Sequence, residues 1–173
     1  MEINPCNFCT ARCCKQYLIT VTSFDILRIH EKTRKSLEEF AELADPKILN
    51  IDNDTILEFY DSSERYPECR VLALKSGPCH FLTKDDRCSI HEFAPLTCKR
   101  YPFGPDGKIT GGAPCPAISK VLFAFVKAEN ERFNHYLTAY KEIVKKWNNK
   151  RGKMKDCMGF LMEESKMLLT KSV

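Results

Sequence analysis

The stretch Cys6-Asn7-Phe8-Cys9-Thr10-Ala11-Arg12-Cys13-Cys14 places four cysteines within nine residues. A second group is spread over a longer segment rich in glycine and proline, and comprises Cys79, Cys88, Cys98 and Cys115. Cysteines that only pack in a core do not need such clustering. Thiols separated by two residues can reach one thiophilic metal ion from a single short loop. The pattern therefore predicts a metal or iron–sulfur centre whose candidate ligands are Cys6, Cys9, Cys13, Cys14, Cys79, Cys88, Cys98 and Cys115.

The adjacent pair Cys13-Cys14 constrains how such a centre is built. Neighbouring side chains point to opposite faces of an extended chain and diverge by about 100° on a helix. Two adjacent thiolates therefore do not easily ligate one ion in the same way. The pair is expected to serve two metals or different corners of one polynuclear cluster. A vicinal disulfide is the other option, and it needs a strained ring.

Eight thiols divide into two four-thiolate sites, or form one cluster with spare thiols. Zinc held by four cysteines is a closed structural site, and an iron–sulfur cluster also takes four thiolates. The two groups lie on different loops, and they build one shared centre if those loops converge in space. His80 and His91 neighbour the second group, where either ring could ligate a metal or hydrogen-bond a sulfur. Cys157 is predicted to pack in a helix, and Cys69 is not expected to be a ligand.

Length, charge and hydropathy limit the class of protein. The 173 residues suit one domain, and the formal net charge of +4 is mild. The longest apolar run, 121–126, is too short to span a membrane, and the first residues lack a secretory signal pattern. We therefore expect a cytoplasmic protein, in which clustered cysteines indicate metal or redox sites. Basic residues gather at 145–155, but no nucleic-acid module is visible, so an unidentified protein is expected as partner or substrate.

Local patterns predict short strands and helices in the first half of the chain. Residues 17–21, 55–60 and 70–74 are rich in β-branched or aromatic side chains, and the last two segments are expected to pair antiparallel. Thr22-x-x-Asp25 and Ser36-x-x-Glu39 resemble capping boxes, so helices are expected from about residue 23 and over 36–43. The N-terminal cysteines are expected in a loop or short turn. The segment 79–115 is expected to be loop-rich and to be tied down by metal ligation.

The C-terminal part is predicted to be helical. Apolar side chains recur at steps of three and four residues and predict a long amphipathic helix over about 119–148, followed by a second helix over about 154–169. We therefore predict a small α+β single domain over residues 1–173, with a loop-rich, cysteine-ligated metal centre, short strands and covering C-terminal helices. The metal-binding region is expected to span 1–118, and 119–173 to form a helical C-terminal extension.

Several spaced motifs together resemble the YkgJ-type cysteine-cluster family. They are Cys6-x2-Cys9-x3-Cys13-Cys14, Cys79-His80-Phe81-Leu82, Cys88-Ser89-Ile90-His91 and Pro95-Leu96-Thr97-Cys98-Lys99-Arg100-Tyr101-Pro102-Phe103. The family is described as a zinc- or iron-chelating domain and is related to flagellin lysine N-methylase. The chain departs from the family pattern at His91, where Tyr is usual, and at Ala94 and Lys99, where the family has Arg.

The resemblance implies an iron–sulfur protein, with a 4Fe-4S cluster as the expected cofactor, in electron transfer or in protein modification such as lysine methylation. Zinc is the alternative metal, in a structural or interaction module without catalysis. The methylase relationship also implies S-adenosylmethionine as a cofactor, although the chain lacks a glycine-rich nucleotide-binding fingerprint. A thiol–disulfide redox protein is a third alternative. Whether the chain is an enzyme stays open at this stage.

Overall fold

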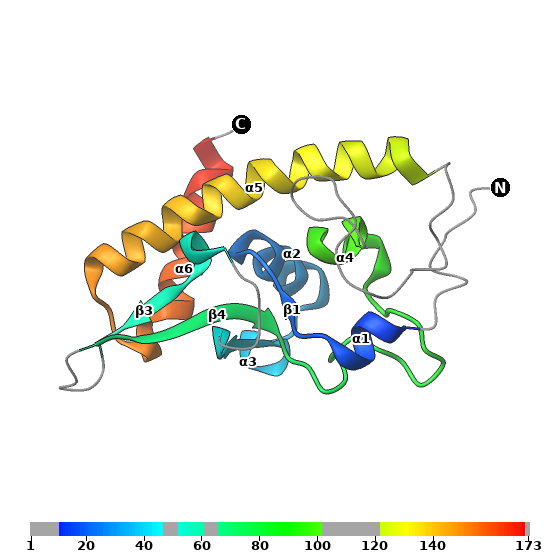
Figure 1. The fold of residues 1–173 in the computed structure, drawn as a ribbon, viewed down its shortest axis with the longest axis horizontal. Coiled ribbons are helices and arrows are strands. Elements are labelled where there is room, and N and C mark those ends of the chain that lie inside the picture. The colour runs from blue at the N-terminus through cyan, green and yellow to red at the C-terminus, as the bar shows by residue number, and fades with distance from the viewer. Residues whose placement is uncertain (1–10, 47–51, 61–65, 102–121, 172–173) are drawn as a thin grey trace.

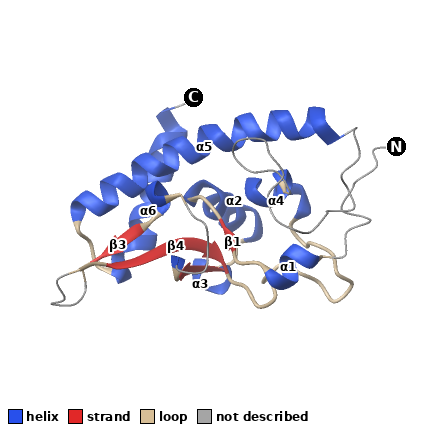
Figure 2. Cartoon of the chain, in the orientation of Figure 1, coloured by secondary structure: helices blue, strands red, loops and turns tan. Residues whose placement is uncertain are grey.

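The computed structural model describes residues 11–46, 52–60, 66–101 and 122–171, with the backbone alone for 122–130. Within these residues, helices and a four-stranded antiparallel sheet form an α+β domain, which confirms the predicted fold class. Figure 1 shows the long helix α5 (Leu122–Lys150) along one side of the domain, with α2 and the strands below it in this view. Figure 2 shows that the strands gather in one region beneath α5 in this view.

The sheet is assembled on one long strand. Its strands are β1 (Ile19–Thr20), β2 (Ala41–Ala44), β3 (Leu57–Phe59) and β4 (Glu68–Leu74). The three shorter strands all pair antiparallel with β4. Leu74 of β4 lies opposite Ile19 of β1 and Ala41 of β2, so β4 is central at this end. The predicted pairing of segments 55–60 and 70–74 is confirmed by the β3–β4 ladder.

The helices surround this sheet and carry most of the described chain. Besides α5 they are α1 (Arg12–Gln16), α2 (Ser23–Thr33), α3 (Leu37–Phe40), α4 (Leu96–Arg100) and α6 (Met154–Lys171), with short 3-10 turns η3 (Asn53–Thr55) and η4 (His91–Phe93). The C-terminal helices pack directly on the N-terminal half. The Ser165 hydroxyl of α6, for example, donates to the Ser23 hydroxyl at the start of α2 at 2.6 Å.

The predicted apolar stripe of α5 faces the core where its side chains are described. Tyr140, Ile143, Val144 and Trp147 are at most 2% exposed, and they follow one another at steps of three, one and three residues. The Trp147 ring packs on Phe59 of β3 at 5.9 Å between centroids, and its indole nitrogen donates to the Glu58 carbonyl at 3.0 Å. The indole therefore stabilises the helix–sheet contact through its large apolar area without burying an unpaired N–H donor. The amphipathic helix is therefore confirmed over this part.

Several local expectations were wrong. The helix predicted over 36–43 ends at Phe40, and Ala41–Ala44 form β2 instead, because the edge of β4 offers backbone partners that outweigh helix propensity. The cysteine pair that was expected in a loop or short turn lies in the five-residue helix α1, and α4 interrupts the segment expected to be loop-rich. Cys69 lies within β4 and not ahead of a strand.

The described helices show no membrane-spanning character, since none combines the necessary length with the necessary apolar content. The helices α5 and α6 end at Lys150 and Lys171, close to the predicted ends. The predicted start near 119 and the division at residue 118 lie outside the described residues. The division into a metal-binding region and a helical extension therefore stays a prediction.

Candidate metal centre

Five of the eight candidate ligands lie in the described part of the chain. They are carried by three parts of the fold: Cys13 and Cys14 by α1, Cys79 and Cys88 by the turns after β4, and Cys98 by α4. Figure 1 shows α1 and α4 at the same end of the domain. The remaining candidates, outside the described residues, are Cys6, Cys9 and Cys115.

A backbone hydrogen bond joins the two cysteine groups. The Cys79 amide donates to the Cys14 carbonyl at 2.8 Å, so the turn after β4 is pinned to α1. Cys88 is held on the same unit, because it forms an isolated antiparallel β-bridge with Leu82. The described members of the two groups, far apart in the sequence, therefore meet in space, as one shared centre requires.

The two adjacent thiols of α1 lie close together. Their Sγ atoms are 3.9 Å apart. A hydrogen bond from Cys14 stabilises the Cys13 thiolate and lowers the pKa of Cys13 to about 6, and the same contact raises the pKa of Cys14. Two sulfurs bound to one tetrahedral zinc ion lie about 3.8 Å apart. The observed separation therefore allows both sulfurs to reach a single ion, which the sequence argument regarded as difficult.

The other three thiols are influenced by burial and by the same thiolate. Burial is the largest cause that raises the pKa of Cys79, Cys88 and Cys98, and the charge of Cys13 raises each of them further. Charges shift one another in this way only when they lie near each other. A bound metal cation would reverse these shifts, because coordination favours the deprotonated thiolate. The described thiols thus behave as one electrostatic group.

The donor set suits a thiophilic metal. Among the described residues, no three His, Cys, Asp or Glu side chains are arranged so that they could hold an ion between them. Five thiols nevertheless share one end of the domain, and three further candidates lie outside the described residues. Thiolates select zinc, copper(I) and iron–sulfur clusters over magnesium or calcium. The residues therefore fit a zinc or iron–sulfur centre in their chemistry.

A buried carboxylate connects α2 to the helix that carries Cys98. Asp25 is 1% exposed, and its Oδ2 accepts from the Thr22 amide at 3.1 Å and the Thr22 hydroxyl at 2.9 Å, which confirms the predicted capping box. Its Oδ1 accepts from the Leu96 amide at the start of α4, also at 3.1 Å. The position of Cys98 therefore depends on a residue of α2.

Arg28 extends this connection by one turn of α2. Its guanidinium pairs with Asp25 Oδ1 at 2.6 Å and donates to the carbonyls of Phe93 and Ala94 at 3.3 and 3.2 Å. Sequence reasoning missed both roles, since it treated Asp25 only as a cap of its own helix. The one available signal was the i, i+3 spacing of Asp25 and Arg28 within the apolar half of this helix.

Basic side chains near the cysteines anchor the surrounding turns. Lys15 of α1 pairs with Asp86 at 2.6 Å, and Lys99 of α4 donates to the Glu92 carbonyl at 2.8 Å. The guanidinium of Arg100 lies 3.6 Å from the centre of the Phe133 ring, so α4 is also held to α5.

The two histidines near the second cysteine group differ in surroundings. His80 is exposed and sets its ring edge-on to Phe81, with 5.0 Å between centroids. His91, at the start of η4, is partly buried, and burial lowers its pKa. A lowered pKa keeps the His91 ring neutral near pH 7, which is the form that can bind a metal. Ligation by either histidine stays a prediction.

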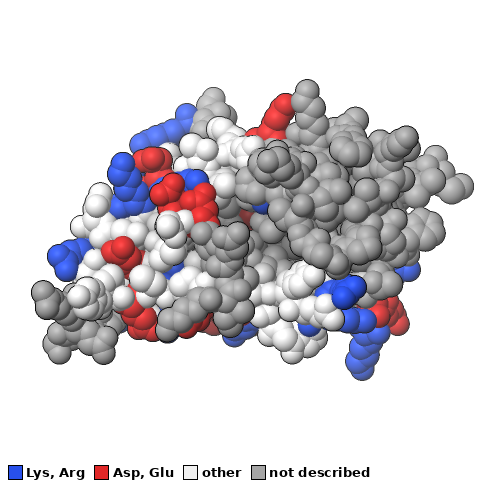
Figure 3. Space-filling view, viewed as in Figure 1, with Lys and Arg blue, Asp and Glu red and all other residues white. Residues whose placement is uncertain are grey.

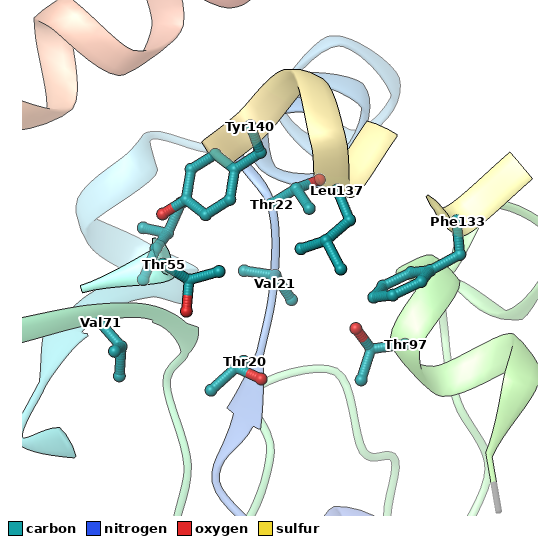
Figure 4. A pocket seen from close by; sticks show the side chains of 10 residues that line it. Thr20, Val21, Thr22, Thr55, Val71, Thr97, Phe133, Leu137 and Tyr140 are labelled. Carbon is teal, nitrogen blue, oxygen red and sulfur yellow. The ribbon is translucent and has the colours of Figure 1, made fainter. Parts of the chain in front are cut away.

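A small pocket lies beside α4, apart from the sulfur atoms. It has a volume of about 50 Å³, which is room for a few water molecules, and neutral side chains line it. Figure 4 shows Thr97 and Phe133 on one side of it and Tyr140 on the other, with the Tyr140 hydroxyl directed toward Thr55. None of the described cysteines lines this pocket, so it is distinct from the cysteine centre.

Three residues of the basic run at 145–155 have partners within the domain. Lys146 pairs with Glu164 of α6 at 2.6 Å, and Lys150 and Arg151 lie over the rings of Phe160 and Tyr60. Figure 3 shows acidic and basic side chains interspersed on the described part of one face. The run therefore resembles an ordinary charged surface more than a platform for a polyanion.

The comparisons with known proteins agree with this picture of the site. A family model named CxxCxxCC, with the description "Putative zinc- or iron-chelating domain", matches residues 5–136. The chain belongs to the CxxCxxCC family. The matched range includes all eight candidate cysteines and the whole of the Asp25–Leu96 connection, and the family description supports metal binding without deciding between zinc and iron. No curated protein and no solved structure matches the chain.

Proposed function

We propose that the two cysteine groups build one shared metal centre, and that this centre is an iron–sulfur cluster of the 4Fe-4S type. The observation that carries the proposal is the hydrogen bond from the Cys79 amide to the Cys14 carbonyl, which brings the two groups together. The ligands are drawn from Cys6, Cys9, Cys13, Cys14, Cys79, Cys88, Cys98 and Cys115.

The electrostatics of the described thiols favour a polynuclear centre. The Cys13 thiolate opposes ionisation of Cys79, Cys88 and Cys98, so several thiolates at this end concentrate negative charge. A cluster spreads the remaining charge over several metal ions and sulfides, whereas a single Zn²⁺ ion leaves it concentrated around one point. When bound, the cluster would supply one-electron chemistry. The chain's own part is to gather the thiols, bury them and limit access of water.

The cluster would serve electron transfer or protein modification such as lysine methylation. Reversible reduction of the loaded protein by dithionite would support electron transfer. Saturable binding of S-adenosylmethionine would support protein modification. The partner or substrate is expected to be a protein, and a cytoplasmic location stays a prediction.

A zinc-binding interaction module without catalysis is the second candidate function. The 3.9 Å between the Sγ atoms of Cys13 and Cys14 favours it, because this distance matches two sulfurs on one tetrahedral ion. In that case the metal would stabilise the turns and α4 and would have no redox role.

Cysteine variants with a matched control test the shared centre. Cys14→Ser and Cys79→Ser, one from each group, are expected to lose most of the metal bound on anaerobic reconstitution with iron and sulfide. Cys69→Ser is the control, because Cys69 lies on β4 outside both groups. If Cys14→Ser and Cys79→Ser each lose only part of the metal and their losses add, two separate sites replace the shared centre. If both retain wild-type loading, the proposal fails.

A further inference from the structure

The helix that carries Cys98 cannot cap itself. α4 has only five residues, and its N-cap, Pro95, makes no side-chain capping hydrogen bond. A helix this short is unstable in isolation, because the free-energy cost of nucleating it exceeds the gain from a single turn of hydrogen bonds. Its free amides also need acceptors when the helix start is buried, as Leu96 is here. The position of Cys98 must therefore be set by contacts from elsewhere in the fold.

Asp25 provides the missing cap from another helix. One of its carboxylate oxygens accepts from the Leu96 amide at 3.1 Å, while the other caps its own helix through Thr22. A negative charge at a helix start also interacts favourably with the helix dipole. Arg28 neutralises the charge of the buried carboxylate and donates hydrogen bonds to the carbonyls of Phe93 and Ala94, the two residues before Pro95.

We infer that Asp25 is a positioning residue of the cysteine centre, because its carboxylate caps α4 from α2 and thereby fixes the helix that presents Cys98. The inference rests on the proposed metal centre. Metal affinity then depends on a residue that touches no metal. Groups that hydrogen-bond a ligating side chain typically change metal affinity by ten- to a hundredfold, and Asp25 acts one step further away, through the backbone of the helix that carries the ligand.

An asparagine cannot replace this carboxylate. Four donors converge on its two oxygens: the Thr22 amide and hydroxyl on Oδ2, and the Arg28 guanidinium and the Leu96 amide on Oδ1. The amide group of Asn has one oxygen and one NH₂, so its NH₂ group faces either the Leu96 amide and Arg28 or the Thr22 amide, none of which can accept a hydrogen bond. Asp25→Asn therefore gives up the cap of α4 or the cap of α2.

The matched control is Glu39→Gln, the same chemical change at the equivalent position of the α3 capping box. Glu39 accepts from the Ser36 amide at 2.8 Å, is exposed, and lies in a helix that carries no cysteine. Metal-free wild type and both variants are titrated anaerobically with Co²⁺, whose thiolate charge-transfer absorption reports coordination. Wild type is expected to bind with these bands, Glu39→Gln to bind within about twofold of it, and Asp25→Asn to bind at least about tenfold more weakly with altered bands.

The outcomes separate this inference from the proposed function. If wild type itself binds no Co²⁺, the proposed metal centre fails. If wild type binds and folded Asp25→Asn matches it in affinity and spectrum, the positioning role is wrong, even if Asp25→Asn melts at a lower temperature. If Asp25→Asn does not fold, Arg28→Lys is tested instead. This variant keeps the positive charge but loses the two guanidinium hydrogen bonds to the Phe93 and Ala94 carbonyls. Arg28→Lys is expected to weaken Co²⁺ binding severalfold, and wild-type binding by this variant overturns the inference.

Discussion

The Asp25 carboxylate accepts a hydrogen bond from the Leu96 amide at 3.1 Å, across 71 residues of sequence. The same carboxylate completes the capping box of its own helix with Thr22. A local device that starts α2 is thus also the contact that sets the start of α4. The end of the domain that carries the described cysteine pair and Cys98 is therefore held by a contact from α2, and not only by turns.

Arg28 is expected to contribute strongly to stability. Its side chain is 22% exposed, while that of its partner Asp25 is 1% exposed, so Arg28→Ala leaves a buried carboxylate without its charged partner. We expect the free energy of unfolding to fall by about 2–3 kcal/mol, which is less than the roughly 3–5 kcal/mol for breaking a fully buried pair because Arg28 is partly hydrated. Urea denaturation of Arg28→Ala measures this. Lys35→Ala, which breaks an exposed pair with Glu39, is the control, and a loss for Arg28→Ala no larger than in this control contradicts the account.

Cys157 is expected to be an inert packing residue of α6. It is 0% exposed, and burial raises the pKa of its thiol to about 12, so the thiol stays protonated through the neutral range. In native protein at pH 7 it should resist iodoacetamide far longer than the partly exposed Cys69. Cys157→Ala should lower the free energy of unfolding by about 1 kcal/mol and leave the metal content unchanged. Loss of metal in Cys157→Ala would show that the ligand set is wrong.

The Tyr140 hydroxyl is expected to reduce the stability of the core. It is buried and has no hydrogen-bond partner within the described residues. An unsatisfied buried hydroxyl costs about 1–3 kcal/mol, so Tyr140→Phe should raise the free energy of unfolding by about 1 kcal/mol. Tyr136→Phe, one turn earlier on α5 and only partly buried, is the control and should change little. A clear destabilisation in Tyr140→Phe means that a water or another group satisfies the hydroxyl.

The Asp52–Lys141 pair predicts a small dependence of stability on acid pH. The Asp52 carboxylate lies 2.5 Å from the Lys141 ammonium, and this hydrogen bond lowers the pKa of Asp52. A lowered folded-state pKa contributes stability above the unfolded value of about 3.9, and the contribution is lost as pH falls through the folded value. Asp52 is largely exposed, so screening limits the effect to about 0.5 kcal/mol. Asp52→Asn should therefore be less stable than wild type at pH 7 and equal to it near pH 2, as measured by urea denaturation at each pH. A difference that is the same at both values contradicts the assignment.

Patterns within one element were read correctly from the sequence. The Thr22–Asp25 capping box, the buried run of β4 and the spacing of Tyr140, Val144 and Trp147 are each set by neighbouring residues. Such signals survive because the same side chains decide both the local conformation and the buried face.

Features decided by partners distant in the sequence were missed. Residues 41–44 have good helix propensity, yet they form a strand because β4 lies beside them. α4 has no capping residue of its own, so its existence could not be predicted without knowing that Asp25 lies next to Leu96. The cysteine spacing predicted two groups of candidate ligands, which stay a prediction, while the contact between their described members depends on the Cys79–Cys14 backbone hydrogen bond, which no spacing encodes.

Metal analysis of the protein purified without oxygen tests the central claim most directly. Iron, zinc and acid-labile sulfide are measured per chain, together with the visible spectrum. The account predicts about four iron and four sulfide per chain, with a broad thiolate-to-iron band. A colourless protein with one or two zinc ions and no sulfide would contradict the iron–sulfur assignment and leave the zinc-stabilised module, and a protein without bound metal would contradict the shared centre itself.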